Sequence, residues 1–125
     1  MSSPIEQAPA PNEATPGSAF QCWQQGYGVI RHSEQTSARV RELAGKLVSA
    51  GHQPDEDTVY RKLIALDRLA SAGLWLVVHM TYCNRVDIAG APLVAQDFKA
   101  SPEGHTGGAL NMVPAYAAYL ALNNL

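Results

Sequence analysis

Apolar residues recur at helical spacing in three stretches of this chain, and each stretch is bounded by residues that start or stop helices. The first stretch covers residues 33–50, where Ser33 is suited to be the N-cap and Gly51 supplies the stop. Its apolar positions are Val40, Leu43, Leu47 and Val48. The remaining face is charged, so the pattern predicts an amphipathic scaffold helix.

A longer helix is predicted from about residue 55 to Tyr82. Its first residues, Asp55, Glu56 and Asp57, place negative charge where the helix dipole favours it. Gly73 lowers the helix propensity locally, and we expect a bend or a close helix crossing there. Beyond that glycine the segment is apolar on all sides, so its second half is expected to be buried.

A third helix is predicted from about residue 109 to 123. Proline fits only the first turn of a helix, so this helix is expected either to start near Asn111 or to be kinked at Pro114. It carries no charged side chain, and such a helix must be covered on nearly all sides. No stretch reads as a strand, so the expected fold class of the chain taken alone is mainly α.

The remaining segments are predicted to be irregular. Residues 1–19 contain four prolines and few apolar side chains, which predicts a disordered leader ahead of a folded unit at 20–125. Residues 20–32 are interrupted by two glycines and are expected to form a short irregular or extended arm. Residues 84–100 are expected to be a connecting loop with a turn at 89–92.

The amino-acid composition indicates which kinds of partner the chain can bind. Charged residues make up 16% of the chain, against about 25% in typical soluble domains, and the shortfall in the C-terminal third predicts surface meant for other protein. The net charge is −2 and no basic cluster is present, so no nucleic-acid or membrane partner is expected. The two cysteines are far apart in sequence and do not suggest a disulfide framework. The chain has no secretory signal at its start, and its uncharged apolar-rich run at 69–80 is too short to span a membrane. We therefore expect a cytoplasmic protein with reduced cysteines.

The glycine-rich turn from Gly104 to Gly108 is the main candidate for chemistry. Such a turn at the start of a helix leaves backbone N–H groups free to bind a phosphate or another anion. His105 within it can donate a hydrogen bond or carry a proton near neutral pH. The alternative is a structural turn whose glycines allow tight packing, and the residues alone favour neither. Nothing in the spacing pairs Asp97 or Glu103 with the imidazole.

The other candidate residues have plainer interpretations. His79 and Cys83 are four positions apart and can share a helix face, but two ligands do not make a metal site, so packing at the helix end is preferred and no metal ligand is assigned. His32 and His52 lie in polar, loop-like contexts and are expected to face solvent.

An ordered series of short motifs runs through the C-terminal half of the chain. Its members are Asn84-Arg85, Pro92-Leu93, Gly104-His105-Thr106-Gly107, Leu110-Asn111 and Leu122-Asn123. This series, within residues 66–125, resembles the N-terminal region of the phosphoketolases, which belong to the transketolase-like group of thiamine-diphosphate enzymes. The resemblance implies that the chain is the N-terminal fragment of an α/β thiamine-diphosphate-binding domain.

The resemblance also implies an activity and a site. Phosphoketolases are lyases that cleave xylulose 5-phosphate or fructose 6-phosphate to acetyl phosphate and an aldose phosphate, and their active sites form between subunits of a homodimer or larger oligomer. It implies His105 as a catalytic residue that lines the substrate channel, and Gly104 and Gly107 as the cofactor-binding turn. Thr106 stands where phosphoketolases usually have tryptophan and transketolases proline, so a transketolase-type transferase or a sugar-phosphate epimerase is also open.

The cofactor of that group is thiamine diphosphate with Mg²⁺, which is held by a downstream Gly-Asp-Gly motif. Residues 1–125 do not contain this motif. We therefore expect a truncated fragment that is inactive alone. Two further interpretations stay open: a non-catalytic helical interaction module that docks through residues 109–125, and a fragment that aggregates through its apolar C-terminal helix.

Overall fold

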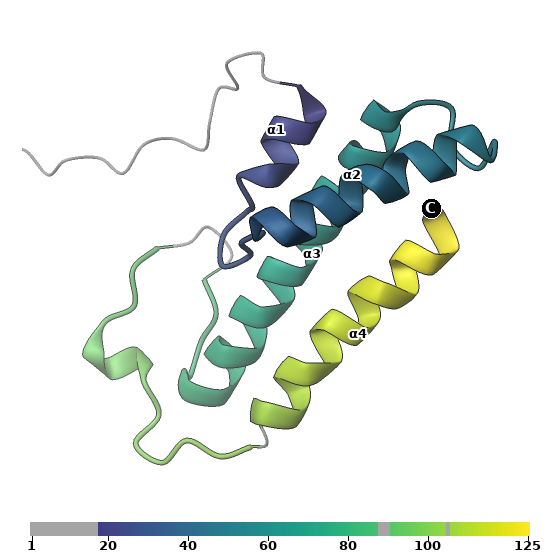
Figure 1. Ribbon diagram of the computed structural model, residues 1–125. Helices are drawn as coiled ribbons and strands as arrows, with labels where there is room; N and C mark the ends of the chain where they lie inside the picture. Colours follow the sequence, from purple (N-terminus) through teal and green to yellow (C-terminus); the bar gives the residue numbers. More distant parts are fainter. Residues whose placement is uncertain (1–17, 88–90, 105) are drawn as a thin grey trace, which may run out of the picture.

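The computed structural model describes residues 18–87, 91–104 and 106–125, and these residues are mainly helical (Figure 1). The elements in chain order are α1 (Ala19–Gln24), α2 (Glu34–Ser49), α3 (Glu56–Tyr82), the short 3-10 helix η1 (Ala95–Asp97) and α4 (Thr106–Asn124). Within the described residues there is no strand, only isolated bridges at Tyr27–Ile30 and Cys83–Phe98. The expected mainly α class is confirmed.

The long helix α3 is the centre of the arrangement. α1 and α2 pack against its N-terminal part, and α4 runs back alongside it (Figure 1). α3 and α4 are antiparallel, because Gly73 lies against Val113 whereas Lys62, earlier in α3, contacts Asn124, later in α4. Every other helix therefore depends on α3 for its place.

Side-chain caps explain where the helices begin. The Ser33 hydroxyl accepts the Thr36 N–H at 3.1 Å to start α2. The Asp55 carboxylate accepts the Thr58 N–H at 2.7 Å to start α3. Both caps satisfy N–H groups that have no partner within a helix. The predicted bounds of α2 and α3 are thereby confirmed, and Gly51 ends α2 with a φ of 77° as expected.

The predicted irregular arm at 20–32 is wrong in its first part. Ser18 and Gln21 form a capping box, so residues 19–24 fold into α1 and the irregular segment starts only after Gln24. Of the predicted disordered leader at 1–19, only Ser18 and Ala19 lie inside the described residues, where they cap and begin α1. Residues 1–17 lie outside them.

The hydrophobic core lies around the N-terminal half of α3. Its buried residues are Trp23 from α1, Ala44 from α2, and Val59 and Tyr60 from α3. Leu125, beyond the end of α4, packs against the same cluster. The core thus joins all four α-helices at one end of the molecule.

The second half of α3 is not buried, contrary to the sequence-based prediction. Leu69 is 51% exposed and Met80 is 62% exposed, and Trp75, Leu76, Val78 and Tyr82 are also exposed. The reason is that α1 and α2 cover only the first half of the helix, while α4 covers the second half along one line. The predicted close crossing at Gly73 is confirmed by its contact with Val113.

Helix α4 starts earlier than predicted. It begins at Thr106 and includes Pro114 in its interior, so a start near Asn111 is wrong. Its C-terminal end is held by two side chains from elsewhere in the chain: Lys62 Nζ donates to the Asn124 carbonyl at 2.7 Å, and Gln53 Nε2 donates to the same oxygen at 3.0 Å. These bonds satisfy a carbonyl at a helix end and place positive charge at the negative end of the dipole.

By length and composition alone, α3 would be able to cross a membrane. That criterion is weak, because core helices of soluble proteins also meet it. In this chain Asp67, within the helix, is bound to His32, and the first half of α3 packs on α1 and α2. The expected cytoplasmic location stays a prediction.

Candidate functional site

The glycine turn, which runs into the first turn of α4, has open space at the Cβ positions of its described glycines. Gly104 has a φ of +132°, a backbone conformation that side chains disfavour. A Cβ added to Gly104, Gly107 or Gly108 would meet no described atom within 4 Å. Tight packing against the described part of the chain therefore does not explain these glycines. His105, the predicted catalytic residue between them, lies outside the described residues.

The first turn of α4 offers free backbone donors. It contains Gly107 and Gly108 and neither acidic nor basic residues, so no side chain of that turn neutralises the positive end of the dipole. The first four N–H groups of a helix have no partner within it. Chemically, this arrangement suits an anionic oxygen that approaches the backbone closely, as a phosphate group does.

The segment that leads into this turn is fixed to the end of α3. Arg85 holds Asp97 through two bonds, Nε to Oδ1 at 2.7 Å and Nη2 to Oδ2 at 3.0 Å. The Asn84 N–H donates to the Asp97 carbonyl at 2.7 Å, and the Lys99 N–H donates to the Tyr82 carbonyl at 2.9 Å. These bonds hold the two ends of the connecting loop together. The segment 98–104, which leads to the glycine turn, is therefore anchored to the end of α3.

The ion pair also stabilises the charged forms of both partners. Hydrogen bonds from Arg85, together with one from the Val94 N–H, lower the pKa of Asp97 below its ordinary value. The same pairing raises the pKa of Arg85. Asp97 is therefore engaged within its own loop, which gives its carboxylate a structural role.

His79 and Cys83 take part in packing at the end of α3. The His79 ring stacks on Trp75 with 3.8 Å between ring centroids, and its Nδ1 lies 2.8 Å from the Trp75 carbonyl oxygen. Cys83 is buried, and its N–H donates to the His79 carbonyl. No group of three metal-ligating side chains occurs among the described residues. Packing at the helix end, the preferred interpretation, is what the structure shows.

His32 does not face solvent, and this prediction is wrong. Its Nε2 lies 2.6 Å from Asp67 Oδ2, and its ring stacks on the buried Trp23 with centroids 4.2 Å apart. The two partners are 35 positions apart, so no local sequence pattern predicts the pair. The contact ties the arm after α1 to α3. His52, by contrast, is exposed as predicted.

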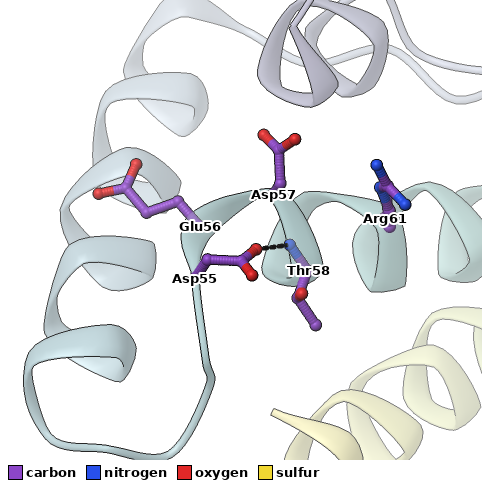
Figure 2. Close-up of a pocket in the computed structure, with 5 residues that line it drawn as sticks. All are labelled: Asp55, Glu56, Asp57, Thr58 and Arg61. Carbon is purple, nitrogen blue, oxygen red and sulfur yellow. Dashed lines mark hydrogen bonds between the residues drawn. The ribbon is translucent and has the colours of Figure 1, made fainter.

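A hollow at the N-terminus of α3 is lined by acidic residues and is best explained by helix capping. Figure 2 shows Glu56 and Asp57 pointing away from each other, with Asp55 bonded to the Thr58 N–H. That N–H is the main reason why the pKa of Asp55 is lowered. Because the carboxylates diverge and one is used as a cap, they do not converge on a cation.

A larger groove of about 860 Å³ lies between the second half of α3 and the connecting loop. Trp75, Leu76, Leu93 and Phe98 give it mostly apolar walls. Arg68 reaches over the Tyr27 ring at its edge, 5.4 Å from the ring centroid. Pro92 and Leu93, one member of the ordered motif series, lie in its wall, whereas the glycine turn does not.

Comparison with known proteins finds no matching protein family, curated protein or solved structure.

Proposed function

We propose that residues 66–125 form the N-terminal part of a thiamine-diphosphate-dependent, phosphoketolase-like enzyme that acts on xylulose 5-phosphate or fructose 6-phosphate. The reaction class in this proposal comes from the resemblance of the ordered motif series to phosphoketolases. The single structural observation that supports it is the open glycine turn at Gly104 and Gly107, which no described residue fills. The parent enzyme would be a cytoplasmic α/β protein that works as a homodimer or larger oligomer.

In this proposal the chain itself binds the sugar phosphate. Free N–H groups in the first turn of α4 donate hydrogen bonds to phosphate or hydroxyl oxygens, and Gly107 lets these oxygens approach the backbone without meeting a side chain. His105, next to Gly104, exchanges a proton with a substrate hydroxyl. The fixed base of the loop at Arg85 and Asp97 gives the turn a defined starting point.

The residues of this chain do not fit thiamine diphosphate and Mg²⁺ on their own. The Gly-Asp-Gly motif is missing from the sequence, and the described residues contain no group of three ligands for a cation. The carbon–carbon cleavage that the cofactor supplies therefore belongs to the complete enzyme. Because Thr106 matches neither the tryptophan usual in phosphoketolases nor the proline usual in transketolases, a transketolase-type transferase and a sugar-phosphate epimerase remain alternatives within this proposal.

Titration of the isotope-labelled chain with fructose 6-phosphate, followed by amide chemical shifts, tests the binding step. We expect the amides of Gly104, Gly107 and Gly108 to move, and those around His52 to stay in place. Fructose without phosphate should leave the turn unchanged, while inorganic phosphate alone should reproduce part of the shift. If fructose 6-phosphate moves none of these amides, the turn is not a sugar-phosphate site.

A matched pair of variants locates the contact. Gly107 and Gly108 both have open space at the Cβ position, so alanine should be tolerated at either one. Because only Gly107 belongs to the motif, Gly107→Ala should weaken fructose 6-phosphate binding about tenfold, a loss of about 1.4 kcal/mol, while Gly108→Ala should not. Equal effects of the two substitutions would contradict a specific role for Gly107.

A second function, a non-catalytic helical interaction module, is favoured by a separate observation. α4 has no buried residue, and four of its large apolar side chains are exposed: Met112, Tyr116, Tyr119 and Leu122. A monodisperse chain that melts cooperatively and binds neither fructose 6-phosphate nor phosphate would support this function over the enzymatic one.

A further inference from the structure

Three exposed apolar residues of α3 and three of α4 form two stripes, one on each helix. On α3 the stripe consists of Leu69, Leu76 and Met80, which are 51%, 42% and 62% exposed. On α4 it consists of Met112, Tyr116 and Tyr119, which are 54%, 63% and 62% exposed. The spacings within each stripe are those of residues on one helix face.

Both stripes lie on the same side of the α3–α4 pair. The contact between Gly73 and Val113 marks the line where the helices face each other. At about 100° per residue, the α3 stripe is rotated back from Gly73 by roughly 20–60°, and the α4 stripe is rotated back from Val113 by roughly 60–120°. In antiparallel helices that face each other, rotation in the same sense leads to the same side. The six side chains therefore form one surface, here called the α3–α4 face.

We propose that the α3–α4 face is the interface for a second copy of this chain, which would complete a four-helix bundle from two α3–α4 pairs. Neither residues 69–80 nor residues 106–124 carry a Lys, Arg, Asp or Glu. A twofold interface places each surface against itself, and an uncharged surface does so without bringing like charges together. Antiparallel helix pairs with apolar stripes associate in this way in bundle proteins.

The area is sufficient for a stable pair. Each of the six side chains is about half exposed, and an aromatic or large aliphatic side chain at that exposure presents on the order of 100 Å². Each copy would then bury roughly 600 Å², and the dimer about 1,200 Å², which reaches the lower bound of specific interfaces. A lipid surface is less suited, because interfacial helices carry Lys and Arg on the polar side and the net charge here is −2.

Sedimentation equilibrium of the unmodified chain between about 1 and 100 μM tests the proposal, a range that covers a micromolar dissociation constant. We expect the mass to approach twice the 13.4 kDa of one copy as the concentration rises. A chain that stays monomeric over the whole range overturns the proposal. So does a monomer that floats with phosphatidylcholine vesicles, because the occupant of the face would then be lipid. This first test does not depend on any variant.

A charge introduced into the face supplies the second test. Tyr116→Lys places two like charges in a twofold interface and should raise the dissociation constant at least about tenfold, a change of 1.4 kcal/mol. Leu122→Lys is the matched control, since Leu122 is 85% exposed and, at about 100° per residue, lies on the opposite side of α4 from Val113 and outside the stripe. Helix content from circular dichroism should be the same in both variants. Equal dissociation constants for the two variants would overturn the proposal, whatever their effect on sugar-phosphate binding.

Discussion

Gly73 and Val113 lie against each other where α3 meets α4, so closely that a Cβ on Gly73 would be 3.3 Å from Val113 Cγ1 and 3.4 Å from its Cγ2. This contact allows α4 to approach the exposed half of α3. Glycine inside a helix is unfavourable by itself, by about 1 kcal/mol relative to alanine. Its presence in the middle of a 27-residue helix is explained by the space that Val113 requires.

The substitution Gly73→Ala separates these two effects. In the natural chain the gain in helix propensity is opposed by the contact with Val113, so we expect less than about 0.5 kcal/mol of net stabilisation. In a Val113→Ala background the contact is relieved, and the same substitution should stabilise by about 1 kcal/mol. A double-mutant cycle measured by urea denaturation gives the difference. An identical effect in both backgrounds would show that the two residues do not interact.

Lys62, in α3, is predicted to stabilise the C-terminal end of α4. Its Nζ donates to the Asn124 carbonyl and also to Gln53 Oε1, at 2.7 and 2.8 Å. Lys62→Met keeps most of the side-chain length but removes the charge and both bonds, so we expect a loss of about 1–2 kcal/mol in the free energy of unfolding. Hydrogen exchange of the last turn of α4 should rise in the variant.

Lys46→Met is the matched control for that measurement. Lys46 pairs with Glu42 one turn earlier on the exposed face of α2, and such surface pairs contribute about 0.5 kcal/mol or less. A larger loss for Lys46→Met than for Lys62→Met would contradict the capping role of Lys62.

Local signals made α2 and α3 predictable from the sequence. Ser33 and Gly51 bound one helix, and Asp55 starts the other, because caps act on neighbours only three or four positions away. The position of the core was not predictable in the same way. The all-round apolar character of α3 after Gly73 indicated burial, but whether a helix face is buried depends on which elements reach it, and here α1 and α2 reach only the first half.

Contacts between residues far apart in the chain were also beyond local reasoning. The pair of His32 and Asp67, and the support of Asn124 by Gln53, join positions separated by 35 and 71 residues. The candidate site was predictable only as a glycine turn before a helix. The structure adds that Gly104 and Gly107 meet open space, a property of the surroundings that the sequence pattern does not carry.

The closure of the connecting loop is predicted to depend on pH through Asp97. Its pKa is lowered in the folded chain by the bonds from Arg85, so the carboxylate is more acidic when folded than when unfolded. A group of this kind contributes its stability at pH values above its unfolded pKa, and the contribution is lost as the pH falls through the folded value. Near neutral pH the loop should therefore stay closed, and it should open below the ordinary value of 3.8.

Hydrogen exchange of the Asn84 and Lys99 amides, which form the base of that loop, reports this opening. We expect their protection to fall as the pH drops below the ordinary carboxyl range, after correction for the intrinsic exchange rate, while amides in the middle of α2 keep theirs. Asp97→Asn removes the ion pair at every pH, so its protection should be low already at neutral pH and should not change further in acid. If the variant matched the natural chain at neutral pH, the loop would be held by its backbone bonds alone. The tie between Arg85 and Asp97 would then play no part in positioning the glycine turn.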